Sequence, residues 1–164
     1  MTITPDPIGP GQESVWAFPR PSVAQPSARH LRIEHHGCVV AETRRAIRTI
    51  ETSHPPTYYF PPADVFVTVT RSARAGSFCE WKGEAVYFDI AVAGVTLYQA
   101  AWSYPTPTAP FAAIAGHLAF NAAAFDASFV DGERVRPQPG GFYGGWITDD
   151  LAGPFKGVPG SRFW

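Results

Sequence analysis

The sequence predicts a mostly β protein: a compact antiparallel domain, either a small barrel or β-tent-like, with one or two short helices. Polar and apolar residues alternate over many short segments, which is the period of half-buried strands. The 15 glycines and 17 prolines among 164 residues divide the chain into short pieces. No regular helical segments separate these pieces, so a doubly wound α/β sheet is not expected.

Three regions follow from composition. Residues 1–29 are rich in Pro and predict an extended N-terminal arm, whose Trp16 and Phe18 are expected to pack onto the domain. Residues 30–136 carry the strand pattern and form the β domain. Residues 137–164 are rich in Gly and aromatic residues and predict a C-terminal extension packed on that domain.

The strands can be placed one by one from alternation and turn residues. Gly37 and the Asp131-Gly132 dipeptide each predict a hairpin. Residues 44–51 fit a helical turn or a strand equally, and residues 110–115 favour a short helix because Pro begins the segment and Ala continues it. The expected strands are 30–35, 38–43, 65–70, 77–81, 84–92, 95–104, 117–120, 125–130 and 133–135.

Charge and cysteine content exclude several classes of protein. The 13 basic and 14 acidic residues give a net charge of -1, which argues against a nucleic-acid binder held by phosphate neutralisation. No apolar run reaches the length of a membrane span, and the first residues do not resemble a secretory signal. Cys38 and Cys79 belong to no CxxC pair, so we expect reduced thiols in a cytoplasmic protein without a cofactor.

The segment 79–89 holds the densest group of reactive side chains. Cys79, Glu80, Lys82 and Glu84 lie around a bend expected at Gly83. A thiol is a candidate nucleophile and a carboxylate is a candidate proton carrier. In the alternative interpretation Cys79 is a small buried hydrophobic residue, and its charged neighbours only decorate a turn.

Aromatic residues form a second group. Trp102 and Tyr104 share one face of a strand beside small residues, and with Trp81 and Tyr59 they suit the wall of a ligand pocket. Aromatic residues of a small β domain also serve simply as core, and that alternative stays open.

Histidines and glycines give weaker signals. His54 precedes two prolines near Glu51 and is a candidate base oriented by a carboxylate, or a residue that only hydrogen-bonds its loop. His30, His35, His36 and His117 have no recognised metal-ligand spacing, and His35 and His36 are expected on opposite faces of a strand, so no metal site is predicted. The glycine cluster 140–145 lacks a phosphate-loop motif and predicts a covering tail.

Three segments, residues 51–59, 79–89 and 101–105, resemble the bacterial and fungal domain-of-unknown-function family 427, also catalogued as a nucleotidyltransferase-like domain. The resemblance covers about His30 to Val135, and the tail 131–159 resembles longer bacterial members. It implies a small, mostly β domain similar in outline to β-tent domains, some of which bind small ligands in an aromatic cage. The chain lacks their CxxC zinc knuckles and the Asp-x-Asp pattern of polymerase-β-like nucleotidyltransferases.

These observations predict a small-molecule-binding or enzymatic domain. Its pocket would lie between the Cys79–Glu84 bend, the Trp102–Tyr104 strand and the Glu51–Tyr59 loop. The alternative is an interaction or scaffold module that docks another chain or forms a homodimer. The candidate catalytic residues are Cys79, Glu84 and His54, and the candidate ligand-binding residues are Trp81, Lys82, Glu80, Trp102, Tyr104, Tyr59 and Glu51.

Overall fold

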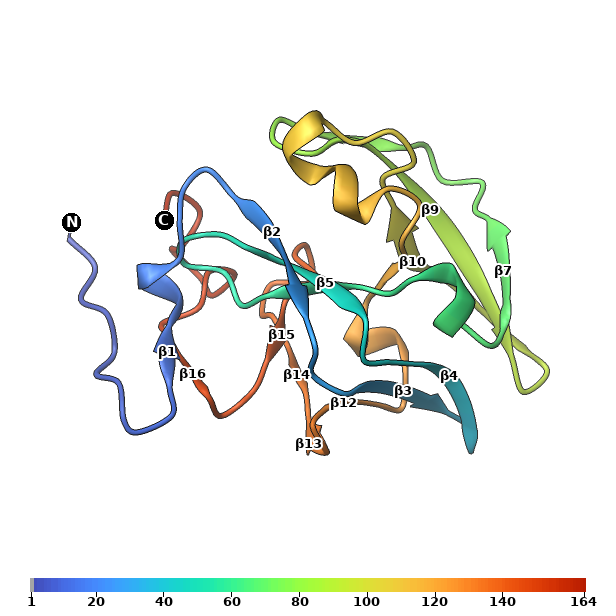
Figure 1. Ribbon diagram of the computed structural model, residues 1–164, viewed down its shortest axis with the longest axis horizontal. Helices are drawn as coiled ribbons and strands as arrows, with labels where there is room; N and C mark the ends of the chain where they lie inside the picture. The colour runs from blue at the N-terminus through green and yellow to red at the C-terminus, as the bar shows by residue number, and fades with distance from the viewer. Residues whose placement is uncertain (1) are drawn as a thin grey trace.

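The computed structural model describes residues 2–164, in which sixteen short strands and four short helices carry the fold (Figure 1). The strands are β1 (Glu13–Ser14), β2 (Val23–Ser27), β3 (Leu31–His35), β4 (Cys38–Thr43), β5 (Ala46–Ile50), β6 (Thr57–Tyr59), β7 (Thr68–Arg71), β8 (Ser77–Cys79), β9 (Gly83–Val92), β10 (Val95–Ser103), β11 (Ala119–Phe120), β12 (Ala127–Val130), β13 (Glu133–Arg134), β14 (Arg136–Pro137), β15 (Trp146–Ile147) and β16 (Leu151–Ala152). The helices, all of the 3-10 type, are η1 (Val15–Ala17), η2 (Pro62–Asp64), η3 (Ala109–Ile114) and η4 (Ala122–Ala124).

The long hairpin of β9 and β10 organises the largest sheet. This five-stranded sheet has the order β11-β10-β9-β7, and β8 pairs with the first residues of β9. A shift of register between Leu97 and Ala101 marks a bulge in β10. Beyond that bulge the strands pair again, and Trp102 lies opposite Tyr87. The bulge therefore separates the exposed tip of the hairpin from the end that carries the aromatic residues.

Two smaller antiparallel sheets complete the body. One has the order β13-β12-β3-β4 and the other has the order β2-β5-β6. The β3–β4 hairpin turns at His36 and Gly37, which have φ values of 46° and 75°, as a two-residue hairpin turn requires. The mostly β, antiparallel prediction is confirmed, but none of the described sheets closes into a barrel.

Apolar side chains from all three larger sheets meet in one core. Leu31, Ile33, Phe60 and Ile90 are fully buried there. Trp146 joins them from the C-terminal extension, and its indole N–H donates to the carbonyl oxygen of Phe120 at 3.3 Å. The extension is therefore part of the packed body.

The structure differs from the sequence prediction at several places and decides one alternative that the sequence left open. Strands β1 and β2 lie within the range assigned to the N-terminal arm, and β2 pairs along its whole length with β5. The ambiguous segment 44–51 forms β5, because β2 and β6 flank it and provide hydrogen bonds on both edges. The strand expected at 65–70 begins only at Thr68, since η2 precedes it and Val65 makes a single bridge to Ala41.

The two end segments of the chain lie side by side, where β1 pairs with β16 in parallel, on the left of Figure 1. No described helix has both the length and the apolar character needed to cross a bilayer.

Candidate functional site

A cavity of about 500 Å³ lies where the β8–β9 turn, the end of β10, the loop after β5 and the C-terminal extension meet. Nine of the ten side chains predicted for a site line this cavity: Glu51, His54, Tyr59, Cys79, Glu80, Trp81, Lys82, Trp102 and Tyr104. Glu84 is the exception. It is exposed on β9, whereas Ala85 and Tyr87 face the cavity, because successive side chains of a strand point to opposite faces. Glu84 therefore cannot serve this cavity as a proton carrier.

The turn between β8 and β9 holds the central residues in place. The Thr108 hydroxyl donates to the Trp81 carbonyl oxygen at 2.6 Å, and the Thr108 backbone N–H donates to the Lys82 carbonyl oxygen at 3.0 Å. These bonds tie the turn to the loop that follows β10. The strand predicted at 77–81 ends at Cys79. Residues 80–82 form a turn, so the neighbouring side chains of Trp81 and Lys82 both line the cavity.

Two buried tyrosines form part of the cavity wall. The rings of Tyr59 and Tyr104 lie 6.3 Å apart between centroids. Burial raises the pKa of both hydroxyls above the ordinary value, and the neighbouring Cys79 raises the pKa of Tyr104 further. Both hydroxyls therefore stay protonated at neutral pH and act as uncharged hydrogen-bonding groups.

Gln138 determines the protonation of His54. The Gln138 side-chain oxygen accepts the Gly145 N–H at 3.1 Å, so its amide nitrogen must donate, to the Lys156 carbonyl oxygen at 2.8 Å and to His54 Nδ1 at 3.0 Å. Burial and the charges of Lys156, Lys82 and Arg20 lower the pKa of His54 to about 4. The imidazole is therefore neutral, with its proton on Nε2.

The proton on His54 Nε2 faces the Glu51 carboxylate, 3.6 Å away. The predicted association of these two residues is therefore present in the structure. To accept a proton at Nε2, however, the neutral ring would have to carry its own proton on Nδ1. That proton would point at the N–H that Gln138 already donates to Nδ1. His54 is consequently arranged as a hydrogen-bond donor to the cavity, not as a base.

Positive charge exceeds negative charge among the lining residues. Lys82, Lys156 and Arg74 line the cavity, together with the carboxylates of Glu51 and Glu80. Within residues 2–164 none of these three cations pairs with an Asp or Glu side chain, although Lys156 Nζ lies 3.1 Å from the main-chain oxygen of Trp164. Five arginines elsewhere do pair with carboxylates, namely Arg29, Arg32, Arg45, Arg48 and Arg136.

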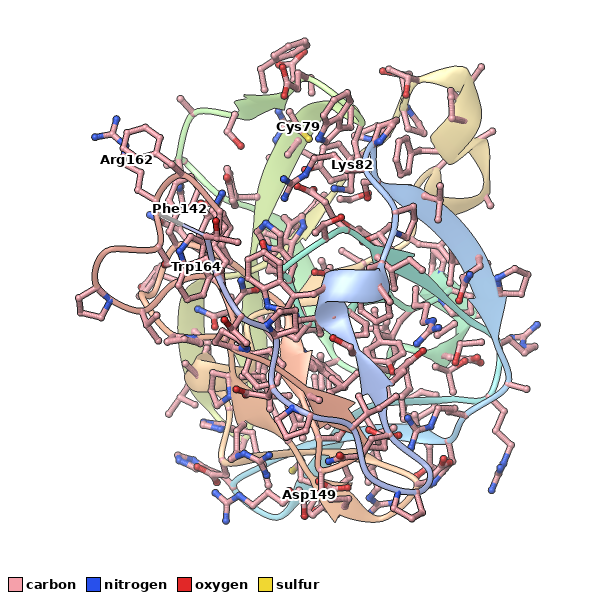
Figure 2. All side chains as sticks on the ribbon, turned by 90° about the vertical axis from the view of Figure 1, so that its left-hand side faces the viewer. Cys79, Lys82, Phe142, Asp149, Arg162 and Trp164 are labelled. Carbon is pink, nitrogen blue, oxygen red and sulfur yellow. The ribbon has the colours of Figure 1, made fainter. Side chains whose placement is uncertain are left out.

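The C-terminal extension supplies one wall that the sequence did not predict. Tyr143 packs edge-on against His54 with 4.8 Å between ring centroids, and a Cβ on Gly144 would lie only 2.1 Å from the Trp102 ring. Figure 2 shows Phe142 of the extension on the same side of the molecule as Cys79 and Lys82. The only sequence signal for this wall was the run of glycines around Phe142 and Tyr143, which allows close approach of the backbone.

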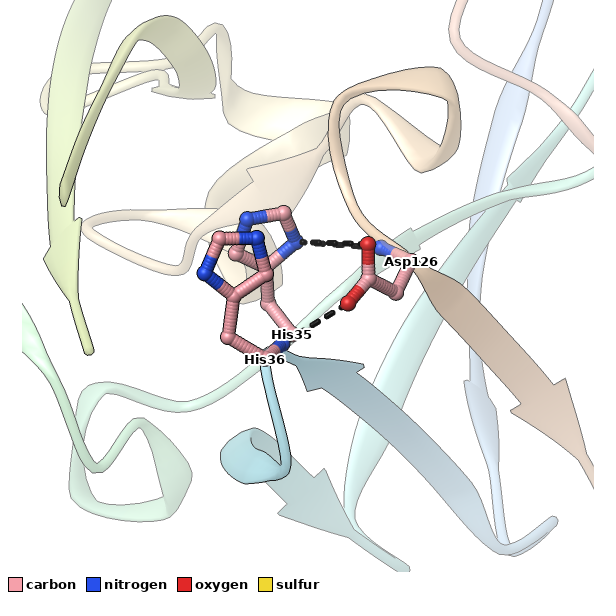
Figure 3. Close-up of side chains that lie close together, drawn as sticks. All are labelled: His35, His36 and Asp126. Atoms are coloured by element: carbon pink, nitrogen blue, oxygen red, sulfur yellow. Dashed lines mark hydrogen bonds and ion pairs between the residues drawn. The ribbon is translucent and has the colours of Figure 1, made fainter.

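A separate polar group lies at the β3–β4 hairpin (Figure 3). Among residues 2–164, His35, His36 and Asp126 are the one set of three potential metal ligands whose ligand atoms lie within 4.8 Å of one another. The prediction that His35 and His36 point to opposite faces is wrong, because the positive φ of His36 turns its ring onto that of His35, 4.2 Å between centroids.

Hydrogen bonds already occupy this group. The Asp126 N–H donates to His35 Nδ1 at 3.1 Å, and the His36 N–H donates to the Asp126 carboxylate at 2.7 Å. That second bond is the main reason why the pKa of Asp126 lies below its ordinary value. The imidazole planes are 14° from parallel, so their nitrogens do not converge on one point. We interpret the group as a set of hydrogen bonds that holds the β3–β4 hairpin against the start of β12.

Comparison with known proteins identifies a family. Residues 23–131, about two thirds of the chain, match the family described as Domain of unknown function (DUF427). The matched range includes β2. No curated protein matches the sequence.

Proposed function

Since the chain belongs to the domain-of-unknown-function family DUF427, whose description states no activity, we propose a function from the cavity itself: the protein binds a small planar organic molecule. Trp81 and Trp102 provide flat apolar surfaces for its ring. Lys82, the hydroxyl of Tyr59 and the Nε2–H of His54 provide polar contacts for its edge.

The observation that carries this proposal is the composition of the cavity. Its volume of about 500 Å³ falls within the usual range for ligand sites, and aromatic walls with a few polar groups are typical of such sites. Two half-buried cations beside aromatic rings support the same function, because Lys82 and Lys156 line the cavity 5.5 Å from the Phe111 ring centre and 5.7 Å from the Tyr143 ring centre and bring charge to it.

The arrangement favours binding over nucleophilic catalysis. A thiol or hydroxyl nucleophile is activated by an adjacent base with a free lone pair. His54, the only histidine of residues 2–164 that lines the cavity, uses its Nδ1 lone pair to accept an N–H of the Gln138 amide. Cys79 lies beside Tyr104, whose hydroxyl keeps its proton.

A second candidate function, docking of another chain, rests on two exposed aromatic side chains at the rim. Phe78 is 78% exposed and Phe142 is 83% exposed, and both line the mouth of the cavity. Exposed aromatic residues in a cluster are typical of interaction surfaces. This function predicts a homodimer whose interface covers both rings.

The test is binding of a planar probe, naphthamide, followed by proton–nitrogen NMR. We expect the indole N–H signals of Trp81 and Trp102 to shift while that of Trp16, which lies outside the cavity, stays in place. Trp102→Ala should weaken binding on the order of tenfold, because it removes one of the two stacking surfaces. Tyr98→Ala is the matched control, since Tyr98 is exposed on the same strand but does not line the cavity.

Two outcomes would overturn the proposal. One is the absence of any shift at Trp81 and Trp102 with naphthamide and with charged naphthalene derivatives. The other is a protein that is dimeric by light scattering and becomes monomeric in Phe78→Ala and Phe142→Ala variants, which would favour the docking function.

A further inference from the structure

We infer that the ligand is an aromatic anion, and that Lys156 of the C-terminal extension, acting with Lys82, selects it by charge. This inference rests on the proposed function and deepens it by naming the chemical class of the ligand. The shared chemistry is a planar ring that carries a carboxylate or a phosphate.

Both ammonium groups retain hydrogen-bonding capacity toward the cavity. Lys156 Nζ donates to one protein oxygen among residues 2–164, the main-chain oxygen of Trp164, at 3.1 Å, and lies 5.7 Å from the centre of the Tyr143 ring. Lys82 Nζ lies 5.5 Å from the centre of the Phe111 ring and has no hydrogen bond to a side chain or carboxylate among residues 2–164. An ammonium has three N–H donors, so donors remain on each residue.

The space beside Lys156 is open on two sides. Lys156, Tyr143 and Phe142 line the main cavity and also a smaller hollow of about 230 Å³ formed by residues of the extension. An anionic group attached to a ring that stacks on Trp102 therefore has room next to the ammonium.

The other charged groups around the cavity leave a positive excess there. Glu51 lies 3.6 Å from Nε2 of the neutral His54 and keeps its negative charge, but Lys82, Lys156 and Arg74 outnumber the carboxylates of Glu51 and Glu80 among the lining residues. Glu80 is exposed at the rim. The lowered pKa of His54 is consistent with this excess of positive charge. Burial is the largest cause of that lowering, and the charges of Lys156, Lys82 and Arg20 are the next largest causes.

Lys156 and the extension residues around it lie outside the family match, whereas Lys82 lies inside it. Gln138, Tyr143 and Lys156 all follow residue 131, where the match to the family ends. The family domain thus contributes Trp81, Trp102 and Lys82, while the extension contributes the second ammonium and the residue that sets the tautomer of His54. The preference for an anion is therefore expected to depend on the extension.

The experiment compares three probes that share one ring system: naphthoate, naphthyl phosphate and the neutral naphthamide. Their dissociation constants are measured by calorimetry on the full chain at low salt. We expect at least one anion to bind on the order of tenfold more tightly than the amide, since a charge-assisted hydrogen bond is stronger than a neutral one. Whichever anion binds more tightly identifies the carboxylate or the phosphate as the natural head group.

Variants then show whether the Lys156 ammonium group causes the preference for the anion. Lys156→Met should remove most of the preference for the anion while leaving the amide affinity unchanged, and Lys156→Arg should keep it. Arg44→Met is the control for net charge, since Arg44 is exposed and lies outside the cavity. If Lys156→Met folds poorly, Lys156→Gln takes its place. In wild type, added salt should weaken binding of the anion but not of the amide, which tests the role of charge independently of any variant.

The outcomes separate this inference from the proposed function. Equal affinity for all three probes would refute the selection of an anion and leave binding itself intact. An anion preference that survives Lys156→Met but is lost in Lys82→Met would show that the extension does not select the ligand. Failure of all three probes to bind would contradict the proposed function as well.

Discussion

Replacing Gly144 by alanine tests the closure of the cavity by the C-terminal extension. The added Cβ would lie 2.1 Å from Cη2 and 2.6 Å from Cζ2 of Trp102. Carbon atoms in contact normally lie about 3.5–4.0 Å apart, so the indole or the extension must move by roughly 1.5 Å. Gly144 does not have a positive φ, so this steric overlap is the main expected source of strain.

Overpacking of this kind typically destabilises a protein by about 1–3 kcal/mol. For a chain of this size each kcal/mol lowers the melting temperature by about 2–4 °C, so we expect a decrease of roughly 2–12 °C. The assay is thermal and urea unfolding of the variant followed by circular dichroism. Gly9→Ala is the control, because Gly9 also lacks a positive φ and its added Cβ would make only an ordinary contact with Gln12 at 3.4 Å.

A double-mutant cycle isolates the contact. In a Trp102→Ala background the indole atoms are gone, so Gly144→Ala should cost close to nothing and the coupling energy should be about 1–3 kcal/mol. If Gly144→Ala costs the same in both backgrounds, or nothing in either, the extension does not lie on Trp102 and the cavity described here lacks that wall.

Three further predictions concern stability. Trp146→Ala should destabilise the fold by about 3–5 kcal/mol in urea unfolding, because the ring is fully buried in the main core; a loss below about 1 kcal/mol would contradict that placement. The pKa of His54 is about 4 in the folded chain and 6.5 ordinarily, so the unfolded chain binds the proton more readily. The free energy of unfolding should therefore keep its full value above pH 6.5 and fall by up to about 3 kcal/mol as the pH drops toward 4. His54→Gln should flatten that dependence, and an NMR titration midpoint near the ordinary value would disprove the reasoning. Ser128→Ala should be neutral or stabilising by calorimetry, because the buried hydroxyl has no partner among the described residues, whereas Ser161→Ala should destabilise by about 1 kcal/mol because its hydroxyl bonds both Val158 and Gly157.

Local sequence pattern determined most of the strands. Alternation identified β9 and β10, Gly37 identified the β3–β4 hairpin, and the Asp131-Gly132 dipeptide identified the β12–β13 hairpin. These features depend on residues that are neighbours in the chain, and the period of the side chains carries that information directly. The same pattern failed for segment 44–51, because only pairing with β2 and β6 decides between helix and strand there.

Residue chemistry also indicated where to look for a site, since nine of the predicted side chains line one cavity. Tertiary structure decided what the pattern could not, namely which groups face one another. Gln138 and His54 are 84 positions apart, yet their hydrogen bond sets the tautomer of the imidazole and removes it as a base. Lys156, Tyr143 and the close approach of Gly144 to Trp102 likewise depend on how the extension folds back over β10. Periodicity reports the environment of a residue within its own strand, whereas contacts between distant segments arise from packing of the whole chain.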